Sequence, residues 1–140
     1  QTLSIAESCT GGLLSDSITN VPGSSKFFKA GIIAYANEVK TNFLNVPAII
    51  LKKYGAVSSP VAGKMAEGVR RKFRTDFGIS TTGIAGPAGA SKLKPVGLVF
   101  TAVSTPGKTI CQKFVFRGSR KAIKSKARQA AFRLFLKSLP

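Results

Sequence analysis

The sequence predicts an α/β layered domain built on a mixed sheet, and two observations carry this prediction. Apolar or β-branched runs alternate with segments of helical periodicity as far as residue 82. The two apolar runs that follow, 96–104 and 109–116, flank a Thr-Pro-Gly-Lys turn and predict a hairpin. In chain order we expect a strand at 3–6, a helix at 13–18 and a strand at 27–35, followed by helices at 37–44, 47–54 and 58–73. Three strands at 78–82, 96–104 and 109–116 and a long helix from 119 complete the domain.

The elements of the first half rest on short local patterns. Residues 3–6 are apolar, and a small-residue turn separates them from Leu13, Leu14 and Ile18, which recur at helical spacing. A turn at 21–25 precedes the run 27–35, which is rich in aromatic and β-branched residues as a buried strand is.

Three further helices follow from their end signals and periodicity. Residues 37–44 are weakly helical, and the segment 47–54 has proline in its first turn and glycine after its last. Ser58-Ser59-Pro60 is a strong helix start, and apolar residues then recur every four positions as far as Phe73. Ser119 is a candidate cap for the last helix.

Charge is the most unusual feature of the composition. The chain has 22 lysines and arginines against five acidic residues, a net charge of +17, which predicts an anionic partner. Two cysteines are too few for a disulfide framework and favour a reducing, cytoplasmic location. No apolar run approaches the roughly 20 residues that cross a bilayer, so we expect no membrane partner.

The absence of histidine restricts the possible chemistry. It excludes Ser-His-Asp and Cys-His catalysis and any histidine metal site. A hydroxyl nucleophile would then need a lysine base whose pKa is lowered by burial or by neighbouring cations. The strand 27–35 is preceded by Ser24 and Ser25 and followed by Lys40, so its two ends offer hydroxyl and amine groups. Spacing alone supports a serine-lysine pair only weakly.

Glycine-rich turns provide the other candidate features. Gly11-Gly12 precedes a helix, and the segment 82–89 has three glycines whose N–H groups can approach a phosphate, although tight turns explain both clusters equally simply. Neither cluster is followed by the Lys-Ser/Thr pair of a P-loop. Cys9 is expected to pack beside the first turn. Glu7 is expected either to orient a ligand hydroxyl or to pair with a cation.

Four motifs occur in register along the chain: Ala6-Glu7-Ser8-Cys9-Thr10-Gly11-Gly12, Gly31-Ile32-Ile33-Ala34-Tyr35-Ala36-Asn37-Glu38-Val39-Lys40, Gly55-Ala56-Val57-Ser58 and Thr82-Gly83-Ile84-Ala85-Gly86-Pro87. With them the chain resembles the CinA C-terminal domain family, which includes the PncC-like nicotinamide-nucleotide amidohydrolases. The resemblance implies a three-layer α/β/α domain over 1–140, without the further N-terminal helix that members commonly carry. It also implies a homo-oligomer that needs no metal or organic cofactor.

The activity implied by the resemblance is hydrolysis of the carboxamide of nicotinamide mononucleotide, giving nicotinic acid mononucleotide and ammonia by a serine-lysine mechanism. Carried onto this sequence, Ser25 is the expected nucleophile, with Ser8 and Ser24 as alternatives, Lys40 is the base and Tyr35 is its hydrogen-bonding partner. The residues expected to bind substrate are Ser8, Thr10, Gly11, Gly12, Thr82, Gly83 and Arg120.

A second interpretation belongs to another class of function. The chain would be a competence- or damage-associated nucleic-acid-binding module whose pocket is inactive, with basic runs at 70–74 and 117–128 facing phosphates. No aromatic residues interleave with these runs and no known nucleic-acid motif accompanies them, so this interpretation is the less favoured one.

Overall fold

A mixed five-stranded sheet forms the centre of the computed structural model, which describes residues 1–140. The strands lie in the order β2-β1-β3-β4-β5. The β1 strand pairs in parallel with β2 and β3, whereas β4 pairs antiparallel with both β3 and β5. Their bounds are β1 Leu3–Glu7, β2 Phe28–Ile33, β3 Phe77–Gly83, β4 Leu98–Ser104 and β5 Thr109–Val115.

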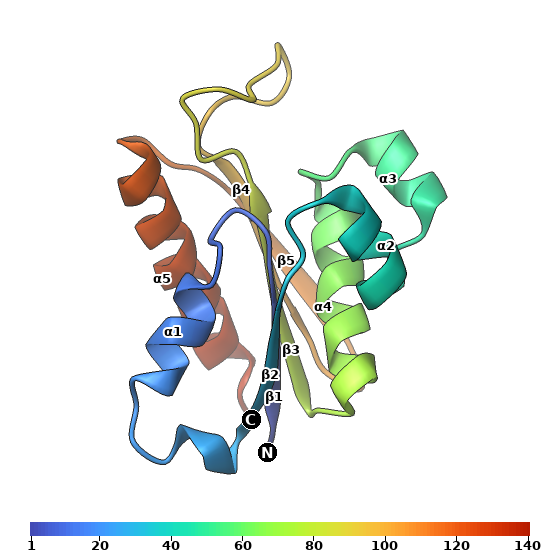
Figure 1. Cartoon of the computed structure of the whole chain (residues 1–140), viewed down its shortest axis with the longest axis vertical. Helices are drawn as coiled ribbons and strands as arrows, with labels where there is room; N and C mark the ends of the chain where they lie inside the picture. The colour runs from blue at the N-terminus through green and yellow to red at the C-terminus, as the bar shows by residue number, and fades with distance from the viewer.

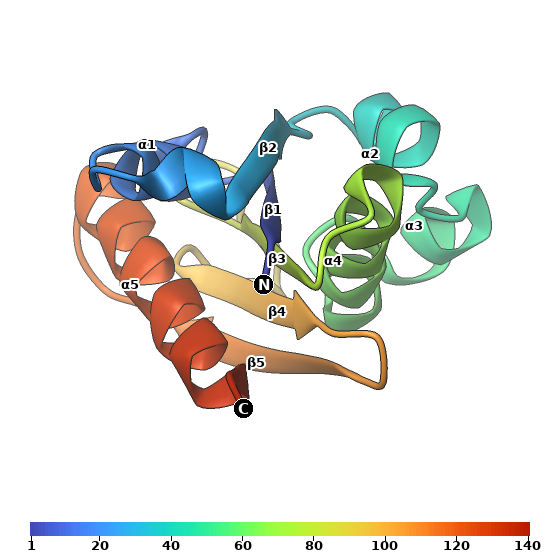
Figure 2. The same cartoon turned by 90° about the horizontal axis from the view of Figure 1, so that it is seen from below.

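Helices cover both faces of this sheet, and the predicted three-layer α/β/α fold is confirmed. In Figure 1, α1 and α5 lie on one side of the sheet and α2, α3 and α4 on the other. Figure 2 shows the same layers from below, with both termini at this end. The helix bounds are α1 Leu13–Thr19, α2 Asn37–Leu44, α3 Ala48–Tyr54, α4 Ser59–Phe73 and α5 Arg120–Ser138, with a 3-10 turn, η1, at Ser24–Lys26. No helix has the length and apolarity needed to cross a membrane.

The two longest helices begin where their serines predict. The Ser58 hydroxyl accepts a hydrogen bond from Val61 N–H at 3.4 Å, and Ser119 accepts one from Ala122 N–H at 3.2 Å. The apolar face of α4, which includes Val61, is fully buried against the sheet. Side-chain caps and apolar periodicity together therefore fix the position of each helix.

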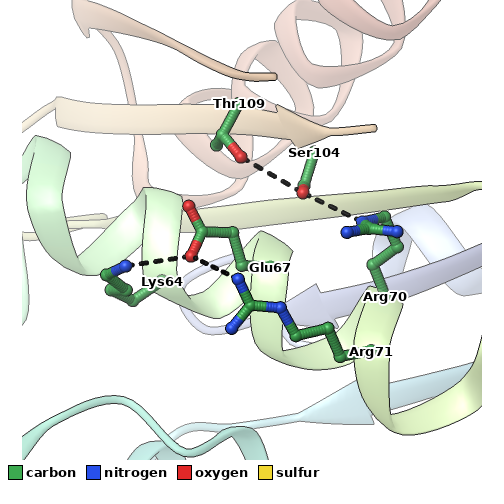
Figure 3. A network of polar contacts seen from close by, with 6 residues as sticks. All are labelled: Lys64, Glu67, Arg70, Arg71, Ser104 and Thr109. Atoms are coloured by element: carbon green, nitrogen blue, oxygen red, sulfur yellow. Dashed lines mark hydrogen bonds and ion pairs between the residues drawn. The ribbon is translucent and has the colours of Figure 1, made fainter. Parts of the chain in front are cut away.

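The polar face of α4 is also tied to the β4–β5 hairpin (Figure 3). Arg70 Nε and Thr109 Oγ1 both donate to the hydroxyl of Ser104, at 3.2 and 3.1 Å. On the same helix, Glu67 forms ion pairs with Lys64 at 3.0 Å and Arg71 at 3.5 Å. These contacts connect the helix layer to the antiparallel half of the sheet.

Three predicted strands, 27–35, 96–104 and 109–116, are longer than the observed ones, and the largest difference is at β2. The run 27–35 predicts a strand as far as Tyr35, but β2 ends at Ile33. Beyond it, Ala34 N–H still donates to Glu7, while the carbonyls of Ala34 and Tyr35 accept from the Lys40 ammonium group instead of a neighbouring strand. A side chain from α2 thus replaces strand pairing at this point.

The topology determines where a site can form. The three parallel strands β1, β2 and β3 end at the same edge of the sheet, so the segments that follow them lie close together. The chain leaves β1 through α1 on one face and leaves β2 through α2, α3 and α4 on the other. Open α/β sheets bind ligands where such connections diverge.

Candidate active site

A cavity of about 250 Å³ lies at the carboxyl ends of the parallel strands. Its walls come from the segments after β1, β2 and β3, from the connection between α3 and α4, and from the start of α5. The lining residues are Ser8, Cys9, Tyr35, Asn37, Lys40, Ala56, Val57, Thr82, Gly83, Ile84, Ala85, Gly86, Ala88, Gly89 and Arg120. All four motifs of the sequence therefore contribute to a single cavity.

Lys40 is the most unusual side chain of this cavity because it is charged by default and only 1% exposed. It lies on the inner face of α2, one helical turn before the buried Leu44. Its Nζ lies 2.7 Å from the carbonyl oxygen of Ala34, 3.0 Å from that of Tyr35 and 3.2 Å from Ser8 Oγ. The lysine predicted as a base is thus hydrogen-bonded to the hydroxyl of a serine.

These three contacts suit the neutral amine as well as the ammonium. Burial lowers the pKa of Lys40 below the ordinary lysine value, although the negative charge of Glu38 acts in the opposite direction. An ammonium donates to all three oxygens. A neutral amine keeps two N–H bonds for the two carbonyls and directs its lone pair at the Ser8 hydroxyl, which is the geometry of a general base.

Ser8 is held in place from both sides. Its N–H donates to the Thr81 carbonyl at 3.0 Å, and its own carbonyl accepts from Gly11 N–H at 3.1 Å. In the turn so formed, the N–H groups of Cys9 and Thr10 have no acceptor within the protein. The Ser8 hydroxyl and two backbone donors without an internal acceptor therefore follow one another in the chain.

Ser25, the nucleophile expected from the resemblance, lies elsewhere. It belongs to η1, exposed and before the amino end of β2, whereas Lys40 contacts the carbonyls that follow the carboxyl end of the same strand. The six residues of β2 separate these ends by roughly 20 Å. The structure therefore does not form a Ser25–Lys40 pair; Ser24 lies in the same turn, and Ser8 is the serine that contacts the lysine.

Tyr35 and Arg120 meet at the rim of the cavity. The Arg120 guanidinium donates to the Tyr35 hydroxyl at 3.2 Å and to the Gly86 carbonyl at 2.6 Å. Tyr35 approaches Lys40 through its backbone carbonyl, not through its hydroxyl. The rim therefore has a fixed cation supported by the tyrosine, and the tyrosine side chain itself is 61% exposed.

Thr82 and Gly83 form the wall at the end of β3. The Thr82 hydroxyl donates to the Ala56 carbonyl at 2.8 Å, which fastens the connection between α3 and α4 to the sheet. Gly83 needs its hydrogen side chain, because a Cβ there would lie 2.7 Å from Val99 Cγ2 and 2.8 Å from the carbonyl oxygen of Leu98. Both residues line the cavity, and the threonine hydroxyl is already engaged, so their predicted role in substrate binding stays a prediction.

Thr10, Gly11 and Gly12 do not line the cavity, unlike the expectation for substrate-binding residues. The Thr10 hydroxyl and the Gly12 N–H donate to Glu7, which is fully buried, whereas the Gly11 N–H donates to the Ser8 carbonyl. The carboxylate accepts from Thr10 Oγ1 at 2.6 Å and from Gly12 N–H at 3.1 Å, and it also accepts from two N–H groups at the start of α1. Because this carboxylate occupies the amino end of α1, a substrate phosphate has no place there.

Asn37 and Cys9 are lining residues with polar or ionisable side chains that were given no catalytic or binding role from the sequence. Asn37 starts α2 between Tyr35 and Lys40, and only its place inside a quoted motif pointed to it. Cys9 lines the cavity next to Ser8, but burial raises the pKa of its thiol to about 12, so it stays protonated at neutral pH. The chain nowhere gathers three His, Cys, Asp or Glu side chains in the manner of a metal site.

Comparison with known proteins agrees with the motifs. The model of the CinA C-terminal domain family matches residues 1–139. A CinA-like protein from Syntrophus aciditrophicus is 48% identical over 139 residues, which cover 99% of this chain and 33% of that protein. A CinA-like protein from Dictyoglomus thermophilum is 54% identical over 123 residues, covering 88% of this chain and 30% of that protein. The chain therefore spans about a third of the length of these curated relatives.

Solved structures show the same fold. A competence-damaged protein (CinA) superfamily protein from Escherichia coli superposes with a TM-score of 0.95 at 32% identity, covering 99% of this chain and 80% of that one. A competence/damage inducible protein from Agrobacterium tumefaciens gives 0.95 at 35% identity, covering 97% and 84%. Whole-chain family match, relatives and structures agree, and the chain belongs to the CinA C-terminal domain family.

Proposed function

We propose that this domain is an amidohydrolase in which Ser8 is the nucleophile and Lys40 its general base, acting on nicotinamide mononucleotide. The observation that carries the proposal is the contact of 3.2 Å between Lys40 Nζ and Ser8 Oγ at the buried end of the cavity. The substrate follows from the resemblance to the PncC-like amidohydrolases and suits a cavity with a cation at its rim.

In the first half of the reaction, Ser8 Oγ attacks the carboxamide carbon while its proton passes to Lys40 Nζ. The new C–O bond pushes the carbonyl electron pair onto oxygen. The Lys40 ammonium then returns the proton to the amide nitrogen, the C–N bond breaks and ammonia leaves. The products of this half are free ammonia and an ester on Ser8.

In the second half, water replaces ammonia in the same geometry. Lys40 accepts a proton from water as the water oxygen attacks the ester carbon, and then passes that proton to Ser8 Oγ as the ester bond breaks. Nicotinic acid mononucleotide forms as the carboxylic acid, which ionises to the carboxylate by releasing its proton to solvent, where the ammonia from the first half takes it up. One base thus serves both halves, and no group is consumed.

The negative charge that develops on the carbonyl oxygen needs donors. The N–H group of Cys9 follows the nucleophile directly, belongs to a residue that lines the cavity, and is the candidate for this role. The substrate phosphate is also anionic, and Arg120 at the rim is the cation that faces the cavity. Asn37 on the opposite element offers a carboxamide that can pair with the substrate carboxamide.

The nucleic-acid-binding module with an inactive pocket receives less support. A lysine that is 1% exposed is costly to bury, and its Nζ contacts a serine hydroxyl inside the cavity. An inactive pocket gives no reason to maintain this arrangement.

Ammonia release from nicotinamide mononucleotide tests the proposal, with three variants that separate the candidate serines. Ser8→Ala and Lys40→Met should each lower kcat at least roughly 1000-fold, because each removes a member of the nucleophile-base pair. Ser25→Ala makes the same chemical change at an exposed serine outside the cavity and should stay within about twofold of the unaltered protein. Full activity of Ser8→Ala, or loss of activity in Ser25→Ala, would contradict it.

A further inference from the structure

A groove of about 660 Å³ lies far from the active site in the sheet order, between the edge strand β5 and helix α5. Helix α5 packs on β3 and β4 and leaves β5 beside it at the edge of the sheet (Figure 2). The groove is lined by Cys111, Gln112, Lys113, Phe114, Phe116, Lys126, Gln129, Ala130, Arg133 and Lys137. None of these residues belongs to the cavity around Ser8 and Lys40.

The charge of the groove is uniformly positive. Lys126, Arg133 and Lys137 lie along one face of α5, and Lys113 faces them from β5, with no acidic residue among the lining side chains. These four side chains are exposed. At 1.5 Å per helical residue, the cations of α5 extend over about 16 Å, which is longer than a single phosphate group.

Two aromatic rings border the same groove. Phe114 and Phe116 are stacked, with ring centroids 5.1 Å apart and planes inclined by 10°, and both are half-buried. A row of cations beside partly exposed aromatic rings is the arrangement that binds unpaired nucleotides, with phosphates on the cations and bases on the rings. The basic runs considered in the sequence lacked such aromatic partners.

We propose that the groove between β5 and α5 binds single-stranded nucleic acid. A second copy of this chain is disfavoured as the occupant, because it would place the same cations opposite one another. An acidic peptide would match the charge but has no need of the phenylalanine pair, and it is an outcome that the test distinguishes.

Fluorescence anisotropy with a labelled 12-nucleotide thymidine strand, in about 150 mM salt, tests the proposal. The variant Arg133→Glu/Lys137→Glu alters two exposed cations of the groove and should weaken binding at least about tenfold. The matched control Lys26→Glu/Lys29→Glu has the same net charge but alters exposed residues at the opposite edge of the sheet, and it should change the affinity less than about twofold.

A third variant tests the rings and a competitor tests the class of ligand. Phe114→Leu keeps the apolar volume and all charges but removes a ring, and should weaken binding about fivefold. The proposal would be overturned by equal losses of affinity in the two charge variants or by an unchanged affinity of Phe114→Leu. It would also be overturned if the unaltered protein did not bind the strand, or if poly-glutamate competed equally well. The measurement needs no turnover, so its result is independent of the proposed hydrolase activity.

Discussion

At the scale of single residues, Lys40 combines two properties that oppose each other. Its burial favours the neutral amine, while its two carbonyl partners and the charge of Glu38 favour the ammonium. A general base acts only when deprotonated, so activity should rise with pH through the pKa of Lys40 and then reach a plateau. The midpoint should lie below the ordinary lysine value, because burial lowers the pKa.

A substitution of Glu38 should move the midpoint of this pH profile without changing a residue that lines the cavity. Its negative charge raises the pKa of Lys40, so Glu38→Gln should lower that pKa and shift the rising limb of kcat/KM to lower pH. Asp16→Asn removes the same charge from another exposed carboxylate, on α1, and should leave the limb in place. If the rising limb of kcat/KM moved equally in both variants, the shift would come from the total charge of the protein. That result would contradict the assignment of Lys40 as the base.

At the scale of elements, the position of Lys40 depends on how closely α2 approaches α4. Gly68 of α4 makes this approach possible, because a Cβ there would overlap the backbone carbonyl of Leu44 at the end of α2. Gly68→Ala should therefore lower the free energy of unfolding by about 1 to 2 kcal/mol and reduce activity, as α2 moves together with Lys40. Urea denaturation measures the first effect and ammonia release the second.

Gly63 of the same helix provides the matched control. A Cβ at this position would meet only Thr109 Cγ2, at an ordinary 3.7 Å. Gly63→Ala should raise the free energy of unfolding by about 0.5 to 1 kcal/mol, because alanine is the better helix former. If both substitutions change stability in the same direction, the close approach of α2 and α4 is not what requires glycine at position 68.

The elements themselves were largely predictable, because their signals are local. Ser58-Ser59-Pro60 and the four-residue apolar spacing placed α4 almost to the residue, and the Thr-Pro-Gly-Lys turn placed the hairpin. The identity of the serine was not predictable from spacing. Ser25 and Lys40 lie on either side of one strand, whose length already separates them, but only the parallel register of β1 and β2 shows that Ser8 shares the end with Lys40.

At the scale of the whole molecule, charge repulsion is the dominant electrostatic feature. The net charge is +17, and both ion pairs of the structure share the single carboxylate of Glu67 (Figure 3). Most cations therefore have no carboxylate partner, and the mutual repulsion of the excess positive charge destabilises the folded state. Raising sodium chloride from about 20 to about 300 mM should increase Tm by about 2 to 5 °C as the repulsion is screened. A fall in Tm would mean that attractive pairs dominate.

The most direct test of the central claim is to locate the acyl group on the protein during turnover. The reaction with nicotinamide mononucleotide is quenched in acid, and the tryptic peptide 1–26, which contains all three candidate serines, Ser8, Ser24 and Ser25, is fragmented in a mass spectrometer. The account predicts an ester of nicotinic acid mononucleotide on Ser8. An ester on Ser25, an adduct on Cys9, or turnover without any covalent adduct would contradict it.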